Sequence, residues 1–185
     1  GPRVIAGEFG GLRLSVPRGT RTRPTADRVK ESVFAALGAR VVDAVVLDLY
    51  AGSGALGIEA LSRGAARAVA VDRDAAAQAA IRTNRDRARL GDRLTLRART
   101  VAAYLAEVAA DGPFDLVFAD PPYDTPDAVV AAHLEALGAP GVLAPVPRWC
   151  SSVRGAGSRT WVRAGLPRGP AATAIRSSCC ASPAA

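Results

Sequence analysis

Short apolar segments alternate with segments of helical periodicity from residue 44 onward, and no other feature constrains the fold as strongly. The apolar segments, predicted to be strands, are 44–49, 68–71, 94–97 and 114–119. The intervening segments, predicted to contain helices, are 52–63, 75–89, 101–109 and 128–137. Strands joined by helices pair in parallel, and helices then cover both faces of the sheet. The predicted fold class is therefore α/β, with a Rossmann-like parallel sheet and helices on both faces.

A different pattern occupies the N-terminal part of the chain. Residues 3–16 alternate apolar and polar side chains around a glycine pair, which predicts a β-hairpin. Residues 25–37 carry apolar side chains at helical spacing and are followed by Gly38, which predicts a helix that ends there. We therefore expect a small hairpin and helix extension over residues 1–40.

Charge divides the chain into three segments, which we treat as its domain organisation. Residues 1–40 carry eight basic and three acidic residues, residues 41–145 carry ten and fourteen, and residues 146–185 carry six and none. These segments contribute +5, −4 and +6 to the net charge of +7. A basic N-terminal arm indicates a nucleic-acid partner, so residues 1–40 are predicted to contact RNA and residues 41–145 to form the catalytic domain.

The last segment, residues 146–185, departs from the rest of the chain in composition. It holds all three cysteines and both tryptophans, and it is rich in Arg, Pro, Gly, Ser and Ala. An odd number of cysteines with an adjacent pair predicts neither a metal site nor a disulfide framework. We consider two interpretations, a shifted reading frame near residue 145 and a genuine basic, disordered RNA-binding tail. Neither predicts a strand after residue 145, which would leave the sheet with a bare edge.

No stretch of the chain approaches the roughly 18 uncharged apolar residues of a membrane span, so no membrane partner is expected. Gly1-Pro2 is typical of a protease-cleavage remnant, and no apolar signal segment follows it. The predicted location is the cytoplasm, and the default oligomeric state is a monomer.

A glycine motif follows the first strand of the alternating region. Gly52, Gly54 and Gly57 form the pattern G-x-G-x-x-G. Glycines let the backbone approach a ligand closely and turn sharply into a helix. The motif alone fits a dinucleotide, a methyl donor or a tight turn without a ligand.

Two acidic residues favour S-adenosylmethionine as the cofactor. Asp48 precedes the glycines at the end of the first strand, where a carboxylate suits an ammonium group and not a pyrophosphate. Asp72 ends the second strand, eighteen residues beyond Gly54, where an acid can accept hydrogen bonds from both ribose hydroxyls. Its alternative role is to cap the next helix, which Asp74 could do instead. Because methionine brings an amine and no phosphate, the two acids favour the methyl donor.

The fourth strand is followed by Asp120-Pro121-Pro122-Tyr123. Consecutive prolines stiffen the backbone and remove two N–H donors, which leaves the Pro121 carbonyl able to accept a hydrogen bond from a ligand. Asp120 supplies a second acceptor, and Tyr123 supplies an aromatic face. These groups suit a planar base with an NH₂ group, flipped out of its stack. The alternative is a proline-rich turn without chemistry.

The proposed chemistry requires acceptors at these positions. An exocyclic amine on a base is a poor nucleophile because its lone pair is delocalised into the ring. Acceptors on both N–H bonds favour a pyramidal nitrogen whose lone pair points at the methyl sulfonium. The rest of catalysis is positioning and desolvation, so neither a cysteine nucleophile nor a metal is expected.

Several of these segments resemble a known family. Residues 48–57 resemble motif I of class I methyltransferases, and residues 120–123 resemble their D/N-P-P-Y motif IV. Residues 3–11, 23–34 and 47–65 are similar to the RsmD family of bacterial enzymes, which make N2-methylguanosine in 16S ribosomal RNA of the small subunit. The resemblance covers about residues 3–145.

The resemblance implies roles for the matching residues. Residues 50–54 are implied to bind the methionine part of S-adenosylmethionine, Asp72 and Arg73 the ribose, and Thr100 and Val101 the adenine. With Asp48, the implied donor-binding residues are therefore Asp48, Tyr50, Ala51, Gly52, Ser53, Gly54, Asp72, Arg73, Thr100 and Val101. Those implied to hold the guanine amine and ring are Asp120, Pro121, Pro122 and Tyr123. Those implied to contact RNA phosphates are Arg23, Thr25 and Arg28, for which a solvated basic surface is the alternative. One departure is Arg99-Thr100, where many methyltransferases have an acid or Asn for the adenine amine.

Other functions stay open. A DNA amino-methyltransferase acting on adenine or cytosine uses the same D-P-P-Y chemistry, although the sequence shows no obvious DNA target-recognition domain. A protein-glutamine methyltransferase usually carries Asn before Pro-Pro-Tyr. A non-catalytic RNA-binding or ribosome-assembly factor could retain the fold. The sequence names neither the modified nucleotide nor the form of the substrate, naked RNA or assembled subunit.

Overall fold

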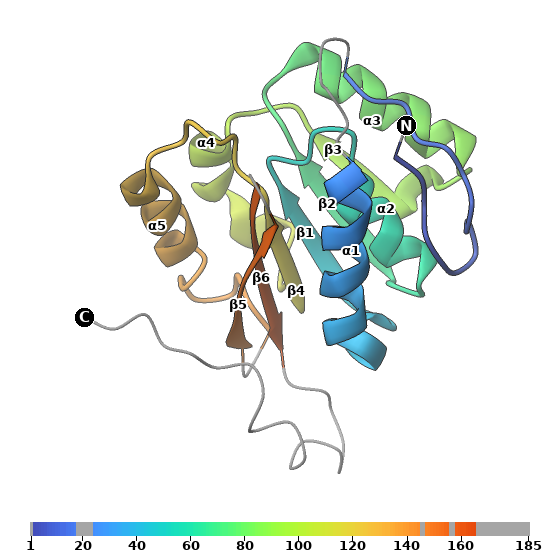
Figure 1. The fold of residues 1–185 in the computed structure, drawn as a ribbon. Helices are drawn as coiled ribbons and strands as arrows, with labels where there is room; N and C mark the ends of the chain where they lie inside the picture. Colours follow the sequence, from blue (N-terminus) through green and yellow to red (C-terminus); the bar gives the residue numbers. More distant parts are fainter. Residues whose placement is uncertain (1, 18–23, 145–146, 156–157, 166–185) are drawn as a thin grey trace.

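The structure is a computed structural model, and it describes residues 2–17, 24–144, 147–155 and 158–165. One sheet runs through it, with strand order β3-β2-β1-β4-β6-β5 (Figure 1). The strands are β1 Val45–Leu49, β2 Arg67–Val71, β3 Leu94–Arg97, β4 Leu116–Ala119, β5 Pro147–Gly155 and β6 Ser158–Gly165. The first four pair in parallel, whereas β6 pairs antiparallel with both β4 and β5.

Helices cover both faces of the sheet (Figure 1). The helices are α1 Pro24–Leu37, α2 Ala55–Ser62, α3 Ala75–Arg87, α4 Val101–Leu105 and α5 Asp127–Ala136, and the 3-10 helices are Gly38–Val41, Gly91–Arg93 and Val108–Ala110. Alternate side chains of β1 face opposite sides of the sheet. Val46 belongs to the core cluster shared with α1, α2 and α3, whereas Leu47 and Leu49 belong to the cluster shared with α4. Among the described residues, no helix is long and apolar enough to span a membrane.

The predicted α/β fold is confirmed. Each strand predicted between residues 44 and 119 begins and ends within two residues of its predicted bounds. The helix predicted over 101–109 is shorter, because α4 ends at Leu105 and a 3-10 turn follows. The strand predicted to begin at residue 114 begins at Leu116, and Phe114 instead makes an isolated parallel bridge to Leu143.

The N-terminal arm, residues 2–17, is hairpin-like but holds only one antiparallel bridge, between Arg3 and Arg13. Val4 and Leu14 point into the core beside α1, α2 and α3. The predicted hairpin is therefore reduced to a short pairing. The physical reason is competition near the turn, because the N–H of Ala6, which a longer ladder would use, donates to Glu59 of α2 instead.

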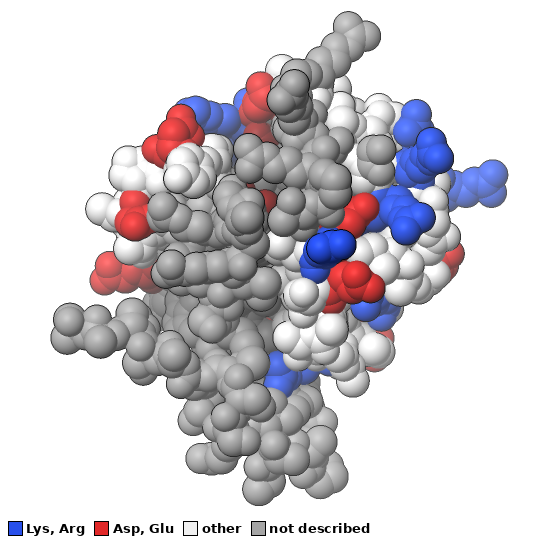
Figure 2. Space-filling model, in the orientation of Figure 1, with Lys and Arg blue, Asp and Glu red and all other residues white. Residues whose placement is uncertain are grey.

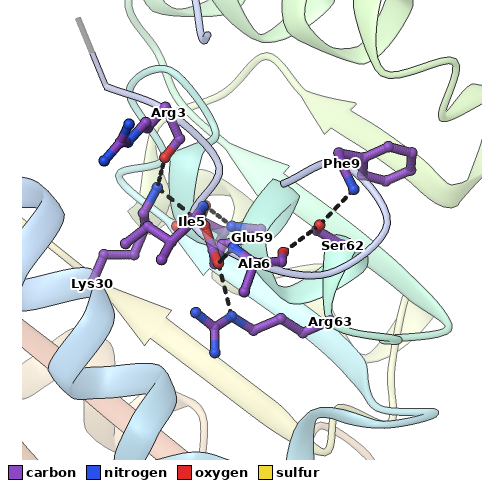
Figure 3. A network of polar contacts seen from close by, with 10 residues as sticks. Arg3, Ile5, Ala6, Phe9, Lys30, Glu59, Ser62 and Arg63 are labelled. Carbon is purple, nitrogen blue, oxygen red and sulfur yellow. Dashed lines mark hydrogen bonds and ion pairs between the residues drawn. The ribbon is translucent and has the colours of Figure 1, made fainter. Parts of the chain in front are cut away.

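Glu59 of α2 is the main attachment point of the arm (Figure 3). Its fully buried carboxylate accepts hydrogen bonds from the backbone N–H of Ile5, at 2.8 Å, and of Ala6, at 3.2 Å. It also pairs with Lys30 of α1 at 3.2 Å and with Arg63 at 2.7 Å. Lys30 lies in residues 23–34, one of the segments that resemble the RsmD family, so part of that segment serves to join the arm, α1 and α2.

Close backbone packing completes this attachment. Ser62 donates to the carbonyl of Ala6 at 2.6 Å and accepts from the N–H of Phe9 at 2.9 Å (Figure 3). Gly7 adopts a φ of +89°, and a Cβ there would lie 1.9 Å from the carbonyl oxygen of Ser62. Only glycine therefore fits at this contact between the arm and α2.

The expectation that no strand follows residue 145 is wrong. β5 and β6 form an antiparallel pair, and β6 adds to the edge of β4. An uncovered strand offers unpaired backbone groups to any neighbouring segment of extended chain. Residues 145–146, 156–157 and 166–185 of the predicted tail lie outside the described residues. The shifted reading frame and the disordered tail stay predictions, and sequencing the gene through its stop codon tests the first.

Candidate active site

The glycine loop, residues 50–54, connects β1 to α2 at the carboxyl edge of the sheet. Tyr50, Gly52 and Gly54 all have positive φ, between 56° and 75°. The N–H of Gly52 donates to Asp72 Oδ2 at 2.8 Å, and the N–H of Ala51 donates to the carbonyl of Val71 at 3.0 Å. The loop after β1 and the acid after β2 therefore form one site.

Asp72 and Asp74 divide two roles between them. Asp74 caps α3, because its Oδ2 accepts from the N–H of Ala77 at 2.9 Å. Asp72 is not the cap; its Oδ1 accepts from the N–H of Asp74 at 2.9 Å, and its Oδ2 binds the glycine loop. Each carboxylate oxygen has two lone pairs, so Asp72 keeps the capacity to accept from a ligand hydroxyl. Arg73, next to it, is exposed.

Asp48 lies inside β1 and beneath the glycine loop, not at an open strand end. Its Oδ2 accepts from the N–H of Gly57 at 2.9 Å. A Cβ at Gly57 would lie 3.3 Å from the same oxygen, which explains the third glycine of the motif. The other oxygen, Oδ1, is buried and has no hydrogen-bond partner in the described part of the chain.

The electrostatics of this edge favour a cationic ligand. Burial, with smaller contributions from the charges of Asp120 and Asp72, raises the pKa of Asp48 to about 8, although the hydrogen bond from Gly57 lowers it. Three acids thus lie close enough to influence one another, and one of their oxygens lacks a donor. A donor molecule with ammonium and sulfonium charges fits this arrangement, whereas a pyrophosphate does not.

Asp48→Asn should remove a pH-dependent loss of stability. Because the pKa of Asp48 rises from 3.8 to about 8 on folding, the folded chain keeps a proton that the unfolded chain has lost. This contribution to stability is complete below about pH 4 and declines as the pH rises toward 8, by up to about 1.4 kcal/mol per pH unit.

Urea denaturation at about pH 5 and pH 7 measures this effect. We expect the unfolding free energy of the unmodified protein to fall more steeply over this interval than that of Asp48→Asn. Asp43→Asn, which alters an exposed acid before β1, is the control and should keep the steep fall. Equal pH dependence in the unmodified protein and Asp48→Asn would contradict the account.

The D-P-P-Y segment lies beside the glycine loop, because β4 pairs with β1 and the N–H of Asp120 lies 3.4 Å from the carbonyl of Leu49. The Pro122 carbonyl accepts from Thr125 at 3.0 Å and closes a turn. In the described residues no backbone hydrogen bond reaches the Pro121 carbonyl. Tyr123 is 80% exposed, so its ring is accessible to a base.

The remaining predicted residues are more dispersed. Thr100 caps α4 by accepting from the N–H of Ala103 at 3.1 Å, and Val101 is buried in the core. Arg28 is exposed on α1. Arg23 lies outside the described residues, and of Thr25 only the backbone, in α1, is described.

Sequence reasoning missed Asn84, which joins the arm to the glycine loop. Asn84 is fully buried in α3. Its Nδ2 donates to the carbonyls of Ser53 and Ser15, both at 2.9 Å, and its Oδ1 accepts from the N–H of Ser15 at 2.7 Å. The available signal was that it is the chain's single asparagine, set among the apolar positions of a predicted helix.

Asn84→Asp should weaken donor binding as well as stability. The change keeps the shape but replaces two N–H donors with a buried acceptor facing two carbonyls, at a cost of about 2 kcal/mol. Calorimetric titration with S-adenosylmethionine should therefore show a lower affinity. Thr83→Ala, an exposed change on the same helix, is the control. Unchanged donor affinity in Asn84→Asp would show that the loop does not depend on this contact.

His133 is the second residue that sequence reasoning missed. Its Nδ1 lies 2.5 Å from the Tyr50 hydroxyl, which connects α5 to the glycine loop. Burial raises the pKa of Tyr50 and lowers the pKa of His133, which favours the neutral form of both groups in this contact. The loop thus contacts the helix that follows the D-P-P-Y segment.

Comparison with known proteins adds an independent line of evidence. The model of a family described as "Conserved hypothetical protein 95" matches residues 2–147. "Ribosomal RNA small subunit methyltransferase D" of Escherichia coli K12 is 40% identical over 121 residues, which are 65% of this chain and 60% of that protein. "Putative rRNA methyltransferase YlbH" of Bacillus subtilis is 42% identical over 122 residues, 65% of this chain and 66% of that protein.

A solved structure agrees with these matches. The "putative methyltransferase yhhF" of Escherichia coli superposes with a TM-score of 0.74 at 29% identity, over 89% of this chain and 97% of that one. In sequence, the chain spans 60 to 66% of the length of the curated relatives described above.

Proposed function

The chain belongs to the family described as Conserved hypothetical protein 95, and from this premise we propose that it methylates the N2 amino group of a guanine in 16S ribosomal RNA. The methyl donor would be S-adenosylmethionine. The observation that carries the proposal is the hydrogen bond from Gly52 to Asp72, beside the D-P-P-Y segment. That hydrogen bond joins the glycine loop to Asp72, and the pairing of β4 with β1 sets the D-P-P-Y segment beside them at the same edge of the sheet.

Residues at this edge divide into three groups around the donor. S-adenosylmethionine supplies an electrophilic methyl group on a cationic sulfur. The residues that would hold its methionine part are Tyr50, Ala51, Gly52, Ser53 and Gly54. A cationic donor would favour loss of the proton from Asp48, whose carboxylate would then offset the positive charge. Asp72 and Arg73 would contact the ribose, and Thr100 and Val101 would lie at the adenine. Because Thr100 caps α4 through its side chain, its contact with adenine is expected to be through the backbone.

The base would be held by the D-P-P-Y segment. Asp120 and the Pro121 carbonyl accept the two N–H bonds of the guanine amine, so that the nitrogen lone pair points toward the donor methyl. Pro122 keeps the turn rigid, and the exposed ring of Tyr123 stacks on the base. Arg23, Thr25 and Arg28 would contact phosphates of the RNA. We further propose that the protein acts as a cytoplasmic monomer on the small ribosomal subunit.

Donor binding separates this enzyme from a non-catalytic factor that retains the fold. Titration of the protein with S-adenosylmethionine, and separately with its demethylated product, should give saturable heats by calorimetry. A nicotinamide dinucleotide should give none, because the acidic edge disfavours a pyrophosphate. Absence of heat with both the donor and its product would favour the binding factor and overturn the proposal.

A further inference from the structure

The end of α3 is strongly basic, although the domain around it is acidic. Residues 82–93 contain five arginines and two aspartates, a local charge of +3. Figure 2, drawn in the orientation of Figure 1, shows Lys and Arg side chains gathered over the side where Figure 1 draws α3. The net charge of residues 41–145 does not reveal this patch, because acidic residues elsewhere in that segment outnumber its basic residues.

Three of these arginines are available for a partner. Arg82, Arg87 and Arg89 are exposed, and in the described part of the structure none of them forms a hydrogen bond or ion pair through its side chain. Arg93 is already engaged, with Glu8 at 3.2 Å and with the carbonyl of Leu61. An unpaired set of guanidinium groups suits phosphate, which arginine binds with two parallel hydrogen bonds.

Two of the free arginines line a groove with the tip of the N-terminal arm. The groove is shallow and open to solvent, and it is formed by Phe9, Gly10, Leu12, Arg87, Ala88 and Arg89. Phe9 and Leu12 give it an apolar wall, while the arginines give it a basic one. Arg93 lies over the Phe9 ring, 5.8 Å from its centroid. An aromatic side chain beside arginines is the combination with which proteins bind single-stranded nucleic acid.

The backbone of Arg89 gives a second reason to assign a function here. Arg89 follows the C-cap of α3 and has a φ of +52°. Glycine is favoured at this position, and a side chain there costs about 1 kcal/mol. Attraction to the negative end of the helix dipole explains why basic residues lie within the last turn of α3. It does not explain why Arg89, which lies beyond that turn in a strained backbone conformation, is an arginine and not a glycine.

We propose that the groove formed by residues 9–12 and 87–89 binds the sugar–phosphate backbone of single-stranded RNA. Arg87 and Arg89 contact the phosphates, and a base packs against Phe9 and Leu12. The proposal rests on the proposed function, since RNA is the substrate there. α3 begins beside Asp72 and is 13 residues long, so the groove extends RNA contact about 20 Å from the donor edge.

Opposite effects on stability and binding test this assignment. Arg89→Gly should raise the melting temperature, because it relieves the left-handed strain, yet lower the affinity for RNA. The double variant Arg87→Ala with Arg89→Gly should lose about tenfold in affinity for a fluorescein-labelled single-stranded RNA. Its log–log salt slope should fall by about 1.4, the value for two phosphate contacts. Arg97→Ala, which removes an exposed positive charge from β3 where Arg97 pairs with Asp111, is the control and should keep both values.

Each alternative result is informative. Unchanged RNA affinity and salt slope in the double variant would overturn the groove as an RNA site. A lower melting temperature in Arg89→Gly would show that this arginine has a structural role and would also overturn the assignment. Retained RNA binding with lost binding to small ribosomal subunits would assign the groove to a protein partner instead. If the unmodified protein neither binds donor nor methylates RNA, the proposed function fails and takes this inference with it.

Discussion

Asp120→Ala is expected to lower the rate of methyl transfer by about 10²-fold to 10³-fold. The carboxylate would accept an N–H of the guanine amine, and removing it leaves the nitrogen lone pair in conjugation with the ring. Donor affinity should fall by a smaller factor, because Asp120 lies close enough to Asp48 to influence its charge. Single-turnover transfer from labelled donor to small ribosomal subunits measures the rate, and calorimetry measures the affinity.

Two further variants test whether the loss of rate comes from the Asp120 carboxylate itself. Asp120→Asn should keep an intermediate rate, because the amide oxygen still accepts one hydrogen bond and the related motif allows Asn. Asp124→Ala removes an exposed acid from the same loop and should keep the full rate. Full turnover in Asp120→Ala would exclude the role assigned to this carboxylate.

Glu59→Ala should reduce the free energy of unfolding by about 3–5 kcal/mol. The change removes the partner of Lys30, whose side chain is only 5% exposed, and leaves a buried positive charge. It also leaves the N–H groups of Ile5 and Ala6 without their acceptor. Urea denaturation measures the loss of stability, and limited proteolysis should show faster cleavage within residues 2–17.

Glu31→Ala is the matched control, because Glu31 is an exposed acid on α1. It should change the unfolding free energy by about 0.5 kcal/mol or less. A loss below about 1 kcal/mol in Glu59→Ala, with the arm still protected from proteolysis, would show that the arm does not depend on this contact.

The sheet and its helices could be predicted because the periodicity of apolar residues is local. Residues 44–49 and 75–89 show a strand and a helix from their own spacing, and the RsmD-type resemblance is confirmed by the family match over residues 2–147. A helix between successive strands then favours parallel pairing. The glycine loop and the D-P-P-Y segment were predictable for the same reason, since each follows a strand directly.

Long-range polar contacts could not be predicted in this way. Asn84 binds Ser15 across 69 positions, and Glu59 binds Ile5 across 54. The spacing of a helix indicates that such a residue is buried, but it says nothing about its partner. The end of β1 was predicted correctly, but the burial of Asp48 depends on Gly57 of α2 packing against its carboxylate, which the spacing of the strand does not indicate.

The tail was predicted from its composition, and composition was a poor guide there. Its arginines and small residues suggested disorder, yet Trp149 and Trp161 lie in paired strands. Pairing with the edge of β4 supplies the backbone partners that local sequence does not indicate.

Transfer of tritium from labelled S-adenosylmethionine to small ribosomal subunits that lack the modification tests the central claim most directly. The RNA is digested to nucleosides afterwards, and duplex DNA is offered in parallel as the competing substrate. The account predicts label in N2-methylguanosine from the subunits and none in DNA. Label in methylated adenine or cytosine of DNA, or no label in RNA from a folded protein that binds the donor, would contradict it.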